Sequence, residues 1–124
     1  MKKSDRKGPL IKSFGYAFEG LFAVIKKERN MKIHCTAAIL VVLFGLFLKI
    51  SKTEWIICFL LFGLIMGLEC VNTAVEAVVD LATEEIHPKA KLAKDAAAGA
   101  VLIAAIFAAL VGMMIFLPKL LLLM

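Results

Sequence analysis

The sequence is poor in charged residues and in proline. Of its 124 residues only 20% are charged and only three are proline, while 62% are hydrophobic. A soluble domain carries roughly 25% charged and about 45–50% apolar residues, and its apolar residues do not gather in runs as long as those found here. The composition therefore excludes an ordinary soluble domain. It predicts a single domain whose helices cross a membrane.

Cysteine pairs and the common nucleotide-binding motifs are also missing. The three cysteines, Cys35, Cys58 and Cys70, show no CxxC or Cys/His metal spacing, so we predict small buried side chains. No GxxxxGK[ST] loop and no HRD or DFG sequence occurs, which excludes P-loop NTPases and soluble protein kinases. The basic start has no hydrophobic region directly after it, so no cleavable signal peptide is expected.

Positive charge is concentrated near the start of the chain. The net charge is +5, and nearly all of this excess lies before residue 33. A basic protein of this kind is a candidate for nucleic-acid binding. Because the apolar runs are so long, we expect no nucleic-acid partner. We expect instead that the basic end, which includes a tail at residues 1–9, lies at a membrane surface.

Four helical segments are expected within one all-α membrane domain covering residues 1–124. Residues 10–30 place apolar side chains at spacings of 3 and 4, typical of an amphipathic helix at a membrane interface or on the protein's own core. Apolar runs at about 33–50, 55–82 and 96–117 predict three transmembrane helices. The second, at roughly 42 Å, should extend past a hydrocarbon core about 30 Å thick. A polar loop is expected at 83–95, and Pro118 is expected to mark the end of the third span.

The distribution of Lys and Arg predicts the orientation of these spans. Twelve of the 15 lie in residues 1–32 and 83–95, and the other three lie in residues 49–54 and near the C-terminal end. By the positive-inside rule, the N-terminus and the 83–95 loop are therefore cytoplasmic. Trp55, the only tryptophan, stands where an interfacial anchor is expected.

A row of polar residues interrupts the second apolar run. Glu69, Asn72, Glu76 and Asp80 follow one another at spacings of 3, 4 and 4, within an arc of about 80° on a helix. Glu69 should lie inside the cytoplasmic leaflet, Glu76 near its boundary and Asp80 outside it. An ionised carboxylate at mid-membrane costs about 2.5–3.5 kcal/mol, so the row needs cations, protons or partners. Carboxylate oxygens are ligands that Mg²⁺ prefers. Apolar surroundings would make Glu69 hold a proton more readily, which suits a general base that works near neutral pH.

Two further pairs of residues accompany this row. Gly63 and Gly67 lie on roughly the opposite face, where they predict close packing of a neighbouring helix. Lys94 precedes the third span on the predicted cytoplasmic side, where its charge is suited to neutralising a phosphate group. Asp95 is a candidate N-cap for that span.

The polar row resembles the signature E-x-x-N-[ST]-x-x-E-x-x-x-D of the small prokaryotic diacylglycerol kinases, a family that includes undecaprenol kinases of Gram-positive bacteria. The resemblance covers about residues 10–117. Matching residues are Glu69, Asn72, Thr73, Glu76 and Asp80, then Glu85, His87 and Ala93-Lys94-Asp95, with Gly15-Tyr16 and Glu28-Arg29-Asn30 upstream. Pro9 departs from the pattern, because many members have an arginine there, and weakens a nucleotide contact expected near that position.

The resemblance implies a homotrimer of chains with three transmembrane helices and one amphipathic surface helix, with active sites shared between neighbouring chains. It implies transfer of phosphate from Mg-ATP to a lipid hydroxyl in the bacterial plasma membrane. Glu69 would be the general base, and Glu28 and Glu76 would hold Mg²⁺ and ATP. The remaining residues implied for ATP binding are Tyr16, Glu85, Ile86, His87, Lys94 and Asp95, with Lys12, Asn72 and Asp80 supporting the site.

The lipid and two other functions stay open from the sequence. Residues 28–34 and His87-Pro88 resemble the Gram-positive members and favour a polyprenol such as undecaprenol, with diacylglycerol as the alternative. An oligomeric cation pathway lined by the acidic row is another interpretation, although residues 55–68 offer no polar group to continue it. A scaffold whose polar row only specifies assembly is the third.

Overall fold

A computed structural model describes residues 8–124, so residues 1–7 of the predicted basic tail lie outside the described part. In residues 8–124 the chain forms four helices and no strands, which confirms the all-α prediction. The helices are α1 (Leu10–Lys27), α2 (Arg29–Leu48), α3 (Lys52–Ala82) and α4 (Pro88–Leu123). By length and composition, α2, α3 and α4 are each able to cross a membrane.

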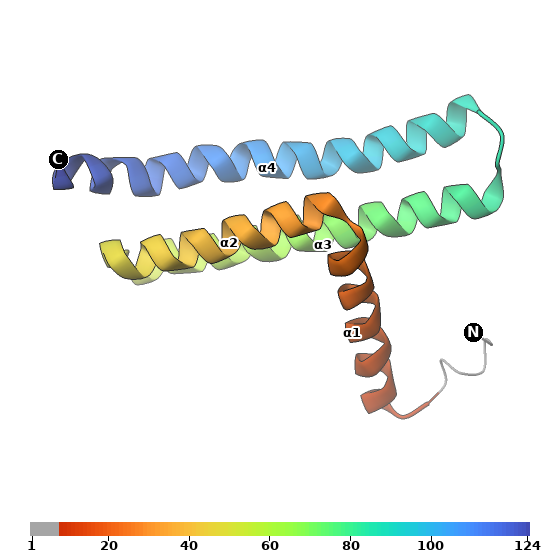
Figure 1. Ribbon diagram of the computed structural model, residues 1–124, viewed down its shortest axis with the longest axis horizontal. Helices are drawn as coiled ribbons and strands as arrows, with labels where there is room; N and C mark the ends of the chain where they lie inside the picture. Colours follow the sequence, from red (N-terminus) through yellow and green to blue (C-terminus); the bar gives the residue numbers. More distant parts are fainter. Residues whose placement is uncertain (1–7) are drawn as a thin grey trace.

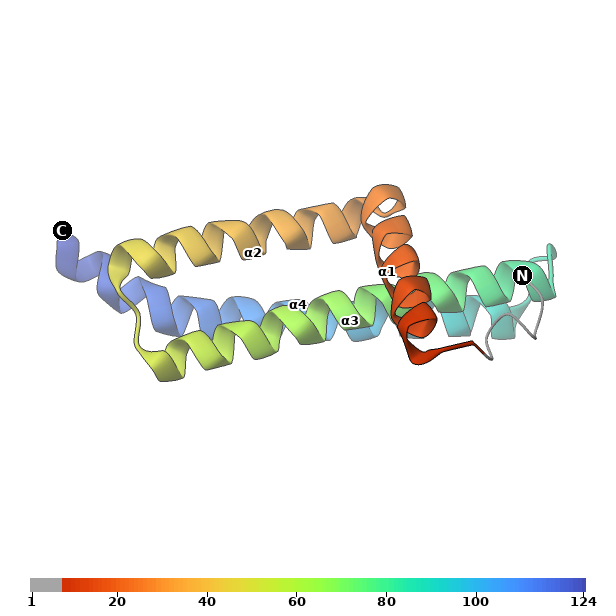
Figure 2. The ribbon, with the colours of Figure 1, turned by 90° about the horizontal axis from the view of Figure 1, so that it is seen from below.

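The three apolar helices run up and down beside one another. Figures 1 and 2 show α3 and α4 as a long hairpin with α2 alongside, and α1 lying across them near the start of α2. With 31 residues, α3 is about 46 Å long, well beyond a hydrocarbon core of about 30 Å. The corner between α3 and α4 accordingly extends past α1 in both views.

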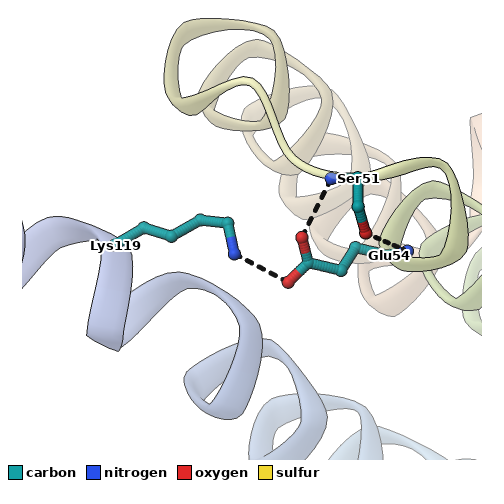
Figure 3. A network of polar contacts seen from close by, with 3 residues as sticks. All are labelled: Ser51, Glu54 and Lys119. Carbon is teal, nitrogen blue, oxygen red and sulfur yellow. Dashed lines mark hydrogen bonds and ion pairs between the residues drawn. The ribbon is translucent and has the colours of Figure 1, made fainter.

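The tight connection between α2 and α3 is built from local polar contacts. Ser51 and Glu54 form a capping box, in which Ser51 N–H donates to Glu54 Oε1 (2.9 Å) and Glu54 N–H donates to Ser51 Oγ (3.1 Å). Lys119 Nζ of α4 lies 2.8 Å from the other Glu54 oxygen (Figure 3). One carboxylate therefore begins α3 and also ties it to the far end of α4.

Trp55 packs the beginning of α3 against α2. A Cβ atom built at the buried Gly45 would lie only 2.7 Å from the Trp55 ring, so the indole occupies the space that a larger residue would need. The ring also stacks on Phe59 with centroids 5.5 Å apart. Trp55 thus holds this corner together, in addition to standing at the end of the helix where an interfacial anchor is expected.

The aromatic face of α1 is not covered by the rest of the chain. Phe14, Phe18 and Phe22 are all more than half exposed, and Val24 is the one residue of α1 that is buried. Of the two settings expected for this helix, packing on the protein's own core is therefore not observed for the aromatic residues. An apolar face with neighbouring basic residues is typical of a helix in the membrane interface.

The last helix differs from its prediction at both ends. It begins at Pro88, so residues 88–95 are helical and the loop is shorter than expected. The N-cap is His87, whose Nδ1 accepts a hydrogen bond from Lys89 N–H (3.1 Å), and the prediction of Asp95 as the cap is wrong. Proline suits this first helical position because its missing N–H needs no partner there.

The helix also passes through Pro118 and ends at Leu123. A proline removes one backbone hydrogen bond from a helix, whereas unwinding the apolar residues after it would leave several backbone groups without partners in lipid. The predicted end at residue 117 is wrong for this reason. The first span likewise begins earlier than expected, at Arg29, and α1 ends earlier, at Lys27.

Two smaller predictions concern glycine and cysteine. A Cβ atom at Gly63 or Gly67 would meet nothing within 4 Å, so the close helix contact expected on that face is not made within the described chain. All three cysteines are free thiols; Cys58 is buried, and Cys35 and Cys70 are partly buried.

Candidate active site

Glu69 is the most deeply buried charged residue that the structure describes. It lies near the middle of the apolar helix α3, and only 1% of its surface is exposed. Its Oε1 is 3.3 Å from Nε2 of His34 in α2. Burying a carboxylate is unfavourable unless a partner compensates the lost hydration. An ionisable residue at such a position in a membrane helix is a candidate functional residue.

Two acceptor atoms in this region have no hydrogen-bond partner among residues 8–124. They are Glu69 Oε1 and Asn72 Oδ1, and both residues line an open pocket of about 240 Å³ between α2, α3 and α4. The His34 contact is close, but it does not satisfy the Glu69 oxygen as a hydrogen bond. Free buried acceptors facing a pocket are suited to binding a hydroxyl group or a cation.

A second group of predicted residues gathers at the corner between α3 and α4. Lys94 Nζ lies 2.5 Å from Asp80 Oδ1 and joins the end of α3 to the start of α4, while Lys91 pairs with Asp95 within α4. An open hollow of about 620 Å³ lies here. The predicted site residues that line it are Asp80, Glu85, Ile86, His87, Lys94 and Asp95.

Glu28 and Glu76 provide two further carboxylates of the predicted site. Glu28 is the extended residue that joins α1 to α2, and Glu76 is partly buried on α3, one turn beyond Asn72. Both carboxylates act electrostatically on Glu69, and Glu76 also acts on Lys94. The acidic row therefore extends along α3 from the buried Glu69 to Asp80, which lines the hollow at the helix ends.

These residues fit a magnesium ion by the nature of their donor atoms. Mg²⁺ prefers oxygen ligands and usually binds one or two protein carboxylates together with phosphate oxygens and water. Glu28 and Glu76 offer two carboxylates that both act electrostatically on Glu69, and the oxygens without a hydrogen-bond partner among residues 8–124 are Glu69 Oε1 and Asn72 Oδ1. In residues 8–124 no three His, Cys, Asp or Glu side chains stand close enough to bind a metal by themselves.

Two predicted residues are not brought to either place. Lys12 is exposed in the first turn of α1, and Tyr16 is partly buried one turn further on. Neither lines the pocket beside Glu69 or the hollow at the corner. These two α1 residues are therefore not part of the lining of either place.

Sequence reasoning did not include His34 among the site residues. The signal was present, because His34 is an ionisable residue just inside the first apolar run, and such residues usually face the interior of a helix bundle. Its partner was not apparent from the sequence. The contact depends on how α2 packs against α3, which no spacing along one helix reveals.

The fold and the site together define a class of protein: a multi-pass helical membrane protein with an acidic site that runs from the membrane interior to one end of its helices. The family model described as prokaryotic diacylglycerol kinase matches residues 15–116. The chain belongs to the prokaryotic diacylglycerol kinase family. The matched range contains every predicted site residue except Lys12.

Curated relatives agree with this assignment. An undecaprenol kinase of Bacillus subtilis (strain 168) is 45% identical over 123 residues, covering 97% of this chain and 100% of the relative. A diacylglycerol kinase of Synechocystis sp. is 42% identical, covering 93% of this chain and 66% of that protein. A diacylglycerol kinase of Escherichia coli (strain K12) is 34% identical, covering 80% of this chain and 81% of the relative. These similarities favour a kinase over a cation pathway or a scaffold.

Proposed function

We propose that the protein transfers the γ-phosphoryl group of ATP to the hydroxyl of a membrane lipid, and that this lipid is undecaprenol. The observation that carries the proposal is the buried Glu69, which lines a pocket among membrane helices and whose Oε1 has no hydrogen-bond partner among residues 8–124. The relative matched over its whole length is named an undecaprenol kinase, which supports the choice of lipid. Diacylglycerol is the alternative, since other relatives are named diacylglycerol kinases.

In the proposed reaction Glu69 is the general base. The lipid hydroxyl gives its proton to the Glu69 carboxylate, and the hydroxyl oxygen forms a bond to the γ-phosphorus. The bond from that phosphorus to the oxygen bridging the β- and γ-phosphates breaks, and ADP leaves. Glu28 and Glu76 are the proposed ligands of Mg²⁺, which when bound neutralises charge on the phosphates. Asn72 supports the hydroxyl from the next turn of α3.

The hollow at the α3–α4 corner is the proposed place of the nucleotide. ATP is supplied from the cytosol, so this end of the helices, with the N-terminus and residues 83–95, is assigned to the cytoplasmic side of the bacterial plasma membrane. The excess of Lys and Arg at this end supports the assignment. Lys94, released from Asp80, provides a cation for the phosphates, while His87 and Glu85 contact the nucleotide.

We also propose a homotrimer whose active sites are shared between neighbouring chains. Three observations support a site completed by a second copy. Gly63 and Gly67 are exposed, a Cβ atom at either would meet nothing within 4 Å among residues 8–124, and the phenylalanines of α1 are more than half exposed. Small residues on an exposed helix face are typical of contacts between membrane helices.

The decisive test is phosphate transfer from labelled ATP by the purified protein in mixed micelles, with undecaprenol and diacylglycerol tested in parallel. We expect Mg²⁺-dependent labelling, preferentially of undecaprenol. Preferential labelling of diacylglycerol would change the substrate and keep the mechanism. Labelling of neither lipid contradicts the proposed function.

A variant at the acidic row tests the site itself. Glu76→Gln removes one proposed Mg²⁺ ligand, and we expect labelling to fall by about 100-fold or more with helix content and elution volume unchanged. The control is Glu19→Gln, which neutralises an exposed carboxylate of α1 and should retain full activity. Full turnover by the Glu76→Gln protein would exclude the assigned role.

A further inference from the structure

His34 occupies the boundary between a polar and an apolar part of the helix bundle. It lines the pocket that holds Glu69 and Asn72, and it also lines an apolar groove of about 330 Å³ between α2, α3 and α4. Ala105 is the one other residue common to both sets. The imidazole, with 20% of its side chain exposed, is thus the polar group where the groove meets the buried carboxylate.

The charge of Glu69 has few other partners. Glu28 and Glu76 act on it electrostatically, and their negative charges repel its carboxylate. Lys94, the nearest lysine in the predicted site, is engaged by Asp80. In residues 8–124 His34 is the side chain in ion-pair distance of Glu69, through Nε2 and Oε1 at 3.3 Å. The imidazole is therefore placed to offset the repulsion and to fix the direction of the carboxylate.

We infer that His34 is a positioning residue for Glu69, whose carboxylate it orients by donating the Nε2–H to Oε1. Because Nε2 faces an acceptor, it is the nitrogen that carries the proton in the neutral ring. The 3.3 Å contact is longer than a good hydrogen bond, and catalytic hydrogen bonds without substrate are often long and tighten when it binds. The inference rests on the proposed function of Glu69 as the base for the lipid hydroxyl.

This arrangement has a specific chemical consequence. A carboxylate in an apolar pocket can rotate or take up a proton, and either change removes it as a base. The donor on α2 holds the charged form in one orientation, in a residue that lines the pocket. His34 therefore affects the rate of proton removal and does not affect the affinity for ATP or lipid.

The test compares two substitutions of His34 with a matched control on the same helix. His34→Leu removes the donor, and we expect kcat to fall about 10- to 100-fold, the range for losing a hydrogen bond to a charged group. KM for ATP and for lipid should change by less than about threefold. His34→Gln keeps an N–H donor and should restore most of kcat. Thr36→Val removes a hydroxyl that bonds Lys32 O, away from Glu69, and should leave kcat unchanged.

A double variant separates positioning from mere structural support. If His34 acts through Glu69, then adding His34→Leu to Glu69→Gln should slow the residual transfer by less than about threefold, because the two losses are not additive. The inference is overturned if the fall in transfer rate of the double variant equals the product of the two single falls. It is also overturned if His34→Gln and His34→Leu are equally inactive although both fold. An inactive wild-type protein instead contradicts the proposed function, whereas an active wild type with a fully active His34→Leu variant contradicts only the role of His34.

Discussion

At the scale of single residues, Lys49 stores strain at the end of α2. It is the non-glycine residue in residues 8–124 with a positive φ, at 53°, and it caps α2 in the left-handed conformation. That conformation costs an L-residue roughly 1–2 kcal/mol, a cost that glycine avoids. We therefore expect Lys49→Gly to raise the free energy of unfolding by about 0.5–1 kcal/mol, measured by thermal unfolding in detergent. Lys49→Ala is the control, since it removes the same charge and keeps the strain, and equal stabilisation by both would show that charge is responsible.

Gly45 represents the opposite case, in which a missing side chain is required. A Cβ atom there would come within 2.9 Å of two Trp55 ring atoms, and the indole is a rigid ring that also stacks on Phe59. Gly45→Ala should lower stability by about 1–3 kcal/mol through overpacking. Gly20→Ala is the comparison, because a Cβ at Gly20 meets nothing within 4 Å and alanine is the better helix former. A Gly45→Ala protein as stable as the wild type would show that α2 moves away from α3 at little cost.

The residues of the site were predictable to different degrees. The acidic row on α3 followed from spacing alone, since helical geometry places positions 69, 72, 76 and 80 on one face. The burial of Glu69 to 1% and its contact with His34 did not follow, because both depend on the packing of α2 on α3. The positions of Lys12 and Tyr16 relative to the hollow depend on where α1 lies, which a single amphipathic pattern leaves undetermined.

At the scale of helices, the pair of Glu54 and Lys119 joins α3 to α4 at the end away from the acidic row (Figure 3). Both side chains are partly buried, and the carboxylate also caps α3. A double-mutant cycle with Glu54→Gln and Lys119→Met should give a coupling energy near the upper limit of exposed pairs, about 1 kcal/mol. The more exposed pair of Lys91 and Asp95 serves as the control and should couple more weakly. A coupling of zero at Glu54 would mean that the ion pair contributes nothing to the contact between the helices.

The ends of the helices show which boundaries local sequence rules can predict and which they cannot. The capping box at Ser51 and the extended His87 before Pro88 obey local rules that a sequence displays. The sequence predicts too late a start for α4 because residues 88–95 carry several charged side chains, a composition typical of a loop. Those residues are helical because an N-cap and a proline at the first position are enough to begin a helix, and its polar turns extend beyond the apolar span.

At the scale of the whole molecule, the proposed orientation is testable by labelling. In a chain with Cys35, Cys58 and Cys70 replaced by alanine, a single cysteine is introduced by Thr53→Cys or by Glu84→Cys, at exposed positions near opposite ends of α3. A membrane-impermeant maleimide should label Thr53→Cys in intact cells and Glu84→Cys in inverted vesicles. The opposite pattern would place the acidic row outside the cell, where ATP is scarce. Retained kinase activity of the cysteine-free chain is the control for folding.

The position of α1 across the other helices has a mechanical consequence for the bilayer. Helices α2, α3 and α4 occupy both monolayers, whereas an interfacial α1, with its three exposed phenylalanines, adds its volume to one monolayer only. Each molecule then expands one leaflet relative to the other and acts as a small wedge. Interfacial helices of this kind respond to curvature and lipid composition. We expect the protein to gather where that leaflet is stretched, so that the local shape of the membrane, and not only the abundance of its lipid, determines where phosphorylation takes place.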